Sequence, residues 1–405
     1  MNFKGIEKIL IIKLRHIGDV LLSAPVFRAL RDNFPDAHIS VLVNKGTEKV
    51  LTGNPFINEI MVFERDIKKM NHFKKYAEEL SFLRCIQKKR FDMTIDLTGG
   101  DRAAIISFIS GARYRLGWKS KKGFIGKRYL YTHLSEPDRK SHMVLQNLDI
   151  IRQFGIGTSN FSIDFHVSET DRLFIKKILE ENNIPLHPPL SKGGQRGVKV
   201  VHVHPTSRWL FKCWKDEYMA EIITWLVEQG MKVVVTSSPD KKEMDKAKRI
   251  LSLVSEFTHP HIPPLPRGGM GWVIDLCGET TIKQLATISE VSDLFFGVDS
   301  APMHIAAAVG TPVIAIFGPS GAFHWGPWDN NQSTENKTQK SEKAPYPNRN
   351  GFQTFGMHTV IQRDWECIPC GKDGCNGSKK SRCLEDIRAE EVKKILAEKI
   401  EGIKR

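Results

Sequence analysis

The chain has 405 residues, more than one hydrophobic core usually supports, so we expect two domains. No run of 18 apolar residues occurs, and the four apolar residues before Lys13 are too few for a signal-peptide core, so we expect a protein that neither crosses a membrane nor is exported. Sixty Lys and Arg against 46 Asp and Glu give a net charge of +14, which favours an anionic partner: nucleic acid, a membrane surface or a phosphorylated small molecule.

Short β-rich runs alternate with helical patterns along the chain, which is typical of parallel sheets covered by helices on both faces. The predicted strands of the first half are Lys8–Leu14, His38–Val43 and Asp92–Leu97. Those of the second half are Val198–His204, Lys232–Ser237, Val273–Leu276, Asp293–Val298 and Val313–Phe317. The sequence therefore predicts an α/β protein with two Rossmann-like domains facing across a cleft. Its expected parts are residues 1–168, a linker over 169–197, residues 198–385 and a C-terminal helix over 386–405.

The first predicted strand leads into Gly18 and Asp19, at a strand end where α/β sheets bind ligands. Asp19 is either the N-cap of the helical run Val20–Phe34 or a general base. Pro25 removes a helical donor, so the helix bends there or begins near Ser23, and in the second case Asp19 lies in a loop that can face substrate. This turn lacks Gly-x-Gly-x-x-Gly, which argues against an NAD-dependent dehydrogenase.

The segment Arg113–Arg128 holds seven Lys or Arg and no acid, interleaved with Tyr114, Trp118 and Phe124. Such a strip either lies on acidic lipid headgroups or is an ordinary solvated loop.

In the second half, Thr206, Ser207, Arg208 and Lys212 occupy the loop that follows the strand ending at His204. Hydroxyls and cations in one such loop suit a diphosphate, because they neutralise the charge that grows on a departing nucleotide. The aromatic residues of the loop are expected to pack it onto the domain; they are Trp209, Phe211 and Trp214.

The strand Asp293–Val298 runs into Asp299 and Ser300. With Ser300 as N-cap and Pro302 in the first turn, a helix begins at the carboxyl end of this strand, where free N–H groups and the helix dipole bind phosphate. His304 lies one turn further on the same face. The alternative is an ordinary capped helix with a packed histidine.

No Asp-x-Asp occurs, so Lys, Arg and helix dipoles are expected to replace a divalent cation, and we expect no metal and no cofactor. Two similar Pro/Gly segments, over 188–194 and 263–269, are expected to be surface insertions, and 329–350 a long exposed loop. Seven cysteines are too sparse for a secreted disulfide scaffold. Four of them cluster, and zinc binding, reduced thiols and a labile disulfide remain open for them. They are Cys367, Cys370, Cys375 and Cys383.

Three motifs in order resemble the GT-B glycosyltransferases and, more narrowly, the lipopolysaccharide heptosyltransferases of family 9, above all the heptosyltransferase III type. They are Lys13–Pro25, His204–Trp214, and Gly297–Ala308 with Gly310–Pro312 and Phe317–Ser320. The likeness runs over roughly residues 8–328. It implies a cytoplasmic enzyme, peripheral on the inner membrane, that moves heptose from ADP-heptose to the phosphorylated inner core of lipopolysaccharide with inversion.

The resemblance also implies roles for particular residues. Asp19 matches the proposed base, and the donor site comprises Thr206, Ser207, Arg208, Lys212, Asp299, Ser300 and His304. The expected acceptor contacts belong to the first half and are Arg15, His16, Gly18, Arg102 and His142.

Three other functions compete with this interpretation. The first is transfer of another nucleotide sugar to a cell-surface glycan, and the second is a sugar-nucleotide-binding module without catalysis. The third, a basic nucleic-acid-binding protein, rests on charge alone, because the chain has no helix-turn-helix or RNA-recognition motif. We therefore expect no nucleic-acid partner.

Overall fold

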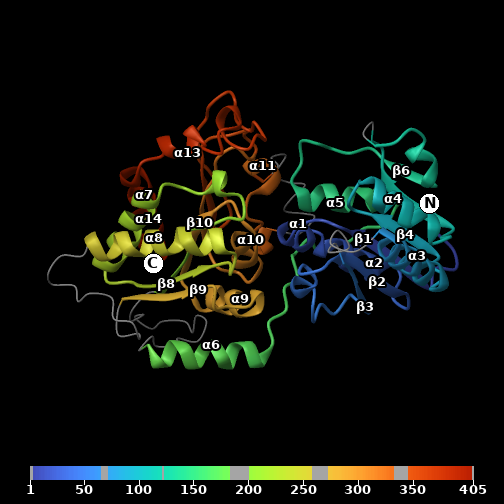
Figure 1. Cartoon of the computed structure of the whole chain (residues 1–405), viewed down its shortest axis with the longest axis horizontal. Coiled ribbons are helices and arrows are strands. Elements are labelled where there is room, and N and C mark those ends of the chain that lie inside the picture. The colour runs from blue at the N-terminus through green and yellow to red at the C-terminus, as the bar shows by residue number, and fades with distance from the viewer. Residues whose placement is uncertain are drawn as a thin grey trace. The chain divides into compact units, whose positions relative to one another are not determined.

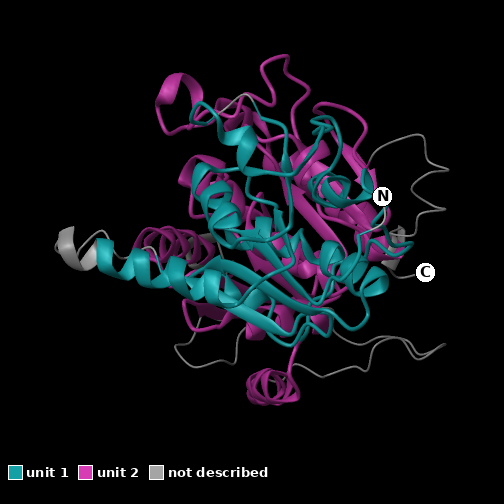
Figure 2. Ribbon diagram, turned by 90° about the vertical axis from the view of Figure 1, so that its right-hand side faces the viewer, with its two compact units in different colours: residues 1–166, 333–342 teal, residues 167–332, 343–405 magenta. Residues whose placement is uncertain are grey.

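The structure is a computed structural model that describes residues 3–64, 72–120, 123–182, 200–257, 272–332 and 345–403. The chain forms two compact units, residues 1–166 with 333–342 and residues 167–332 with 343–405 (Figure 2). Among the described residues, none of the helices is both long and apolar enough to span a membrane.

Unit 1 is built on a six-stranded parallel sheet in the order β3-β2-β1-β4-β5-β6 (Figure 1). Its strands are β1 Lys8–Lys13, β2 His38–Asn44, β3 Glu59–Phe63, β4 Met93–Asp96, β5 Tyr114–Trp118 and β6 His133–Ser135. Its α-helices are α1 Ile17–Leu21, α2 Ala24–Asn33, α3 His72–Lys88, α4 Asp101–Ile109 and α5 Met143–Arg152, and its 3-10 helices are η1 Glu48–Val50 and η3 Lys127–Leu130.

The central strand of unit 1 is β1, whose residues after Lys8 are all buried. A near-continuous apolar strand is typical of a parallel sheet covered on both faces. Leu10 and Ile12 pack in one core with Ile86 of α3 and Ile106 of α4. Since α2 packs against α5, the sheet places the carboxyl end of β1 between covered faces, and the chain continues from there into α1.

Unit 2 contains a seven-stranded sheet in the order β12-β13-β11-β10-β7-β8-β9, parallel except for the β12–β13 pair. Its strands are β7 Val200–His204, β8 Lys232–Ser237, β9 Val273–Cys277, β10 Leu294–Val298, β11 Val313–Ile316, β12 Gln353–Phe355 and β13 His358–Ile361. Its α-helices are α6 Glu169–Glu181, α7 Asp216–Glu228, α8 Lys241–Phe257, α9 Ile282–Val291, α10 Ala301–Ala308, α11 Ala322–Trp325, α13 Arg382–Asp386 and α14 Ala389–Ile403. The 3-10 helices of this unit are η4 Leu210–Lys212, η5 Asn330–Gln332 and η6 Cys375–Gly377.

Strands β7 and β10 are neighbours at the centre of the unit 2 sheet, and Gly297 pairs with His204. A Cβ at Gly297 would lie 2.7 Å from the carbonyl oxygen of His204, so only glycine fits this contact without a shift of backbone. The loops that leave β7 and β10 therefore start side by side.

All eight predicted strands are present, and the two sheets confirm the α/β class with Rossmann-like units. The predicted linker over 169–197 differs from the structure, because it begins with α6. Ser168 caps this helix, Ile175 and Leu179 are buried, and α6 packs on α9 within unit 2. The two Pro/Gly segments lie outside the described residues.

The prediction of an exposed loop over 329–350 is wrong for Asp329 and Tyr346, whereas Asn331 and residues 347–349 are exposed as predicted. Asp329 is buried, and its carboxylate accepts hydrogen bonds from the backbone N–H groups of Asn331 and Met357. Tyr346 is also buried and donates its hydroxyl to the carbonyl oxygen of Pro327. These polar anchors fix the ends of a segment whose composition alone indicated only solvent exposure.

Candidate active site

Asp19 lies in the first turn of the short helix α1, directly after β1, and is half-buried. His16 is the N-cap residue of α1, so Asp19 is neither the cap nor a loop residue. Of the two alternatives for Pro25, a bend or a helix start near Ser23, the structure has the second. A second helix begins after Ser23, and Pro25 lies in its first turn, where a missing N–H is tolerated. Five residues of helix thus hold Asp19 at the carboxyl end of the central strand.

Lys13, the last residue of β1, is a buried cation near Asp19. Its Nζ donates to the carbonyl oxygen of Leu97 at 3.0 Å and to Oδ1 of Asn147 at 2.9 Å. Asn147 in turn donates to the carbonyl oxygen of Leu22, at the end of α1. Burial lowers the pKa of Lys13 to about 8, while the negative charge of Asp19 acts in the opposite direction. Lys13 therefore links the end of β1 to the turn after β4 and, through Asn147, to the end of α1.

The β4–α4 turn is hydrogen-bonded to the same strand end. The hydroxyl of Thr98 accepts from the N–H of Leu14 at 2.8 Å, and its carbonyl oxygen accepts from the Arg15 guanidinium at 2.8 Å. Asp96 is buried at the start of this turn and accepts from the hydroxyl of Tyr131 at 2.6 Å. Burial raises the pKa of Asp96, although its hydrogen bonds oppose that shift.

The five predicted acceptor contacts have different surroundings. Arg15 and His16 are exposed beside Asp19, and Gly18 is half-buried in α1. Arg102 is exposed on α4, where it pairs with Glu79 of α3 at 3.2 Å. His142 is fully buried and accepts from the N–H of Val144 as the N-cap of α5, so its ring is a structural group in this conformation.

In unit 2, the loop after β7 contains buried hydroxyls. Thr206 is fully buried and donates to Oε2 of Glu243 at 2.9 Å, so this hydroxyl proton is already engaged. Burial raises the pKa of Glu243, which lies on α8. Ser207 is also buried, and its Oγ accepts from the N–H of Trp209.

The end of this loop joins the end of β10. Lys212, the last residue of η4, donates from Nζ to Oδ2 of Asp299 at 2.7 Å. The Asp299 side chain is 6% exposed and that of Lys212 23% exposed, so the carboxylate holds a cation that solvent still reaches. Asp299 also donates its N–H to the carbonyl oxygen of Ile316, which fixes it between β10 and β11.

Ser300 is the N-cap residue of α10, and Pro302 lies in the first turn, as predicted. The Ser300 side chain does not cap the helix, and its buried Oγ has no hydrogen-bond partner among the described residues. The N–H groups of a first helical turn have no intrahelical acceptors. A buried hydroxyl and a helix N-terminus therefore lie next to Asp299, while His304 is buried on the same helix.

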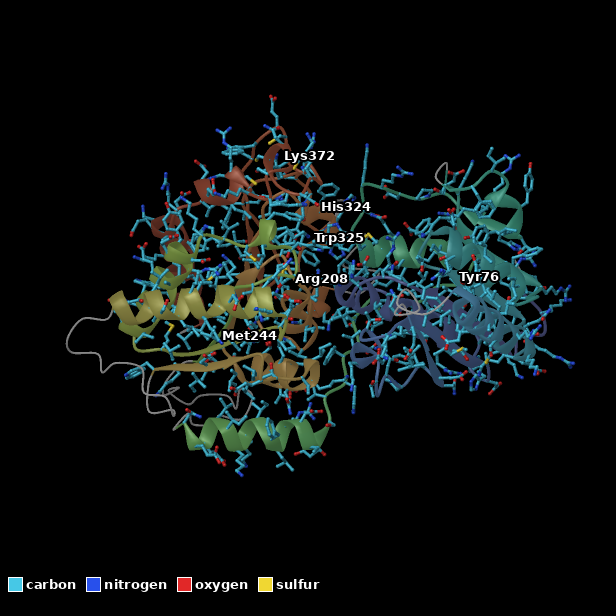
Figure 3. All side chains as sticks on the ribbon, viewed as in Figure 1. Tyr76, Arg208, Met244, His324, Trp325 and Lys372 are labelled. Atoms are coloured by element: carbon cyan, nitrogen blue, oxygen red, sulfur yellow. The ribbon has the colours of Figure 1, made fainter. Side chains whose placement is uncertain are left out.

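Arg208 is exposed, and its guanidinium lies 5.6 Å from the ring of Trp209, which is 45% exposed (Figure 3). Trp214 is buried instead, with its indole N–H bonded to the carbonyl oxygen of Ile387. The expectation that the aromatic residues pack the loop onto the domain thus holds for Trp214, but Trp209 is presented to solvent beside a cation.

All seven cysteines are free thiols. Burial raises the pKa of Cys383 to about 12, and the neighbouring thiols of Cys375, Cys370 and Cys367 act in the same direction. Within the described ranges, no three His, Cys, Asp or Glu side chains are arranged to hold a metal ion. The loop that carries these thiols lies against the strand-end loop after β11, since Cys370 donates its N–H to the carbonyl oxygen of Pro319.

Two Rossmann-like units whose strand ends carry a carboxylate in one and a cation with a free helix N-terminus in the other are typical of GT-B glycosyltransferases. The model of glycosyltransferase family 9 (heptosyltransferase) matches residues 80–351. Lipopolysaccharide heptosyltransferase 3 of Escherichia coli is 30% identical over 329 residues, 78% of this chain and 85% of that protein. The protein of the same name from strain K12 is 31% identical over 321 residues, with 78% and 84% covered. The chain belongs to glycosyltransferase family 9 and is a glycosyltransferase.

Solved structures agree on the fold. The structure of Escherichia coli ADP-heptose lipopolysaccharide heptosyltransferase II has a TM-score of 0.68 at 20% identity, over 98% of each chain. That of Escherichia coli heptosyltransferase WaaC with ADP has a TM-score of 0.63 at 17% identity, over 97% of this chain and 99% of that one.

Two parts of the site could not be found by inspecting motifs. Glu243 holds Thr206 from a helix 37 residues away in sequence. Asn147 links Lys13 to α1 from a helix 134 residues away. Neither residue lies in a motif, and only the fold brings them to the strand ends.

Proposed function

We propose that this glycosyltransferase moves heptose from ADP-heptose to the inner core of lipopolysaccharide, with inversion at the anomeric carbon and without a metal ion. The observation that carries the proposal is the donor site of unit 2, where Lys212, held by Asp299, lies at the strand ends with the hydroxyl of Ser300, which has no partner among the residues that the structure describes. The named relatives and the ADP complex of WaaC point to the same donor class.

The donor diphosphate lies, in this proposal, over Lys212 and the N-terminus of α10. The Lys212 ammonium and the free N–H groups of the first turn receive the negative charge that develops as ADP departs. Ser300 donates its unused hydroxyl to a phosphate oxygen, and Arg208 adds a second cation from the same loop. Asp299 repels phosphate and therefore acts by orienting Lys212. Thr206, whose hydroxyl is bound to Glu243, supports the loop rather than the ligand.

Asp19 is the proposed general base. It takes the proton of an acceptor hydroxyl as that oxygen forms a bond to the anomeric carbon and the bond from this carbon to the diphosphate oxygen breaks. A single displacement of this kind inverts the configuration. Lys13, through Asn147, supports the end of α1, the helix that carries Asp19.

The acceptor is a phosphorylated glycolipid, so we place the reaction at the cytoplasmic face of the inner membrane. Arg15 is the exposed cation nearest in sequence to Asp19, and its guanidinium is fixed by the carbonyl oxygen of Thr98. Arg15, with His16 and Gly18, forms the proposed acceptor edge. Arg102 is a further exposed cation, whereas the buried ring of His142 supports α5.

The test is product formation. Purified protein is incubated with ADP-heptose and lipopolysaccharide core acceptors truncated to different lengths, and products are identified by mass spectrometry. The proposal predicts addition of one heptose to a heptose-containing core in buffer with EDTA. Transfer from a different nucleotide sugar, with none from ADP-heptose, would contradict the donor assignment, and binding of ADP-heptose without any product would contradict catalysis.

A further inference from the structure

The exposed apolar side chains of unit 1 are concentrated on one side of its sheet. Among the described residues of this unit, the large apolar side chains that are exposed lie on β3, α3, α4 and the segment 124–129, and α2 and α5 contribute none. We define the α3–α4 face by the members outside β3, which are Tyr76, Leu80, Ile105, Phe108, Phe124, Ile125 and Tyr129. Figure 3 labels Tyr76, which lies on α3.

These residues belong to one continuous surface, because the elements that carry them are in contact. Helix α3 packs against α4, and α4 packs against η3. The Arg115 guanidinium donates to the carbonyl oxygen of Leu130 and also lies 5.5 Å from the ring of Phe108, so it joins η3 to the exposed side of α4. A single exposed apolar side chain needs no explanation, but a contiguous group of such side chains marks an interaction site.

The most exposed part of the face is the segment 124–129. Ile125 is fully exposed, Tyr129 is 69% exposed and Phe124 is 42% exposed. The segment is nevertheless held firmly: Lys127 is buried, donates to the carbonyl oxygen of Gly99 at 2.7 Å and pairs with Asp101 at 3.2 Å. The exposed apolar side chains are thus carried by a segment that is anchored to the rest of unit 1.

Arginines accompany these apolar groups. Arg128 is exposed and lies 4.6 Å from the ring of Tyr129, and Arg115 lies 5.5 Å from the ring of Phe108. From Arg113 to Arg128 the sequence contains no acidic residue. Acids on the adjoining helices are partly neutralised, since Glu79 pairs with Arg102 and Asp101 with Lys127. Exposed aromatic and aliphatic side chains flanked by cations are typical of surfaces that insert into the interface of an anionic bilayer.

We propose that the α3–α4 face docks unit 1 on an anionic lipid bilayer, with Phe124, Ile125 and Tyr129 entering the headgroup region and Arg128 on a lipid phosphate. This inference deepens the proposed function, because it names the surface that brings the enzyme to a membrane-anchored acceptor. The docking segment is tied through Lys127 to Gly99, in the turn whose Thr98 binds Leu14 and Arg15. A lipid-linked acceptor would thus be delivered to the edge that carries Asp19.

The experiment measures co-sedimentation of the full chain with vesicles, either of phosphatidylcholine alone or with 30% phosphatidylglycerol. The wild type is expected to bind the anionic vesicles and to be released by 0.5 M NaCl. The double variant Phe124→Ser/Ile125→Ser should weaken binding about 10-fold or more, because it removes two apolar side chains that the bilayer would otherwise bury. Arg128→Gln should weaken it about fivefold, the contribution of one cation near an anionic surface.

The matched control is Leu173→Ser/Phe174→Ser on α6 of unit 2, whose side chains are 55% and 46% exposed. It removes a comparable exposed apolar pair and should leave vesicle binding unchanged. Equal loss in both double variants, or none in the first, would overturn the proposal. It would also be overturned if the first variant converted a dimer into a monomer in light scattering and kept its lipid binding. Because vesicles without acceptor are the probe, failure here is distinct from failure of heptosyl transfer.

Discussion

The Lys212 ammonium and the Asp299 carboxylate lie 2.7 Å apart and join the loop after β7 to the end of β10. Asp299 is almost fully buried and Lys212 is not, so the buried carboxylate fixes the direction of a cation that solvent still reaches. A charged group fixed before the ligand arrives needs no reorganisation when negative charge develops, which is the main way that enzymes stabilise such charge.

Lys212→Ala should therefore lower kcat/KM about 100- to 1,000-fold and weaken ADP binding, because the diphosphate loses its fixed cation. Lys215→Ala is the control, since Lys215 is in the same connection but lies 5.1 Å from the ring of Tyr218. Steady-state kinetics and calorimetric titration with ADP check both variants. Equal effects of the two substitutions would show that general loss of charge, and not this position, matters.

Ser300→Ala should weaken donor binding about 5- to 10-fold without lowering the free energy of unfolding, because the Ser300 hydroxyl makes no hydrogen bond within the described part of the chain. Thr281→Ala is a contrasting variant. Thr281 caps α9 through Gln284, so its loss should lower the free energy of unfolding by about 1 kcal/mol and leave ADP binding unchanged. Denaturant unfolding and ADP titration measure the two quantities. Destabilisation by Ser300→Ala would identify it as an ordinary cap.

The pH dependence of stability should report the buried Lys13. Its pKa is about 8 in the folded protein and 10.5 as the ordinary value. Between these values the unfolded chain binds more protons, so the free energy of unfolding rises with pH in this window. Below pH 8 the unfavourable burial of the charge is fully present, and above 10.5 it has been relieved.

Lys13→Met removes this titration. The difference in unfolding free energy, wild type minus variant, should therefore increase by roughly 1–3 kcal/mol from pH 7.5 to pH 10.5. Urea unfolding at several pH values provides the measurement, and Lys119→Met, at an exposed position paired with Glu136, is the control. A difference that stays constant over this range would mean that Lys13 is not buried as a titrating cation.

The strands were predictable because their apolar runs are bounded by turn residues, and both candidate ligand-binding turns follow from the rule that α/β sheets bind at strand ends. The surroundings of Asp19 were less predictable. Its sequence allowed a cap or a loop. In the structure the hydroxyl of Ser23 donates to the carbonyl oxygen of Val20 at the end of α1, and Pro25 lies in the first turn of a second helix. Strands β3, β5, β6, β12 and β13 were missed, and most are short edge or near-edge strands with weak apolar patterns.

Pairings between distant residues were out of reach. The sequence placed Lys212 and Asp299 after two predicted strands, but it gave no reason for these strands to be neighbours or for the bond across 87 residues. It also assigned the Thr206 hydroxyl to the diphosphate, while the fold uses that hydroxyl on Glu243. Such contacts depend on side-chain directions at the ends of the sheet, which periodicity does not encode.

The central claim is that Asp19 is the base in a transfer whose donor is held elsewhere, by Lys212 and the N-terminus of α10. Asp19→Asn keeps the size of the side chain and removes its ability to take a proton, so it tests that claim most directly. We predict that kcat falls about 100- to 10,000-fold, while the dissociation constant for ADP, measured by calorimetry, changes less than about threefold. A variant that keeps most of its turnover, or that loses turnover and ADP binding together, would contradict the account.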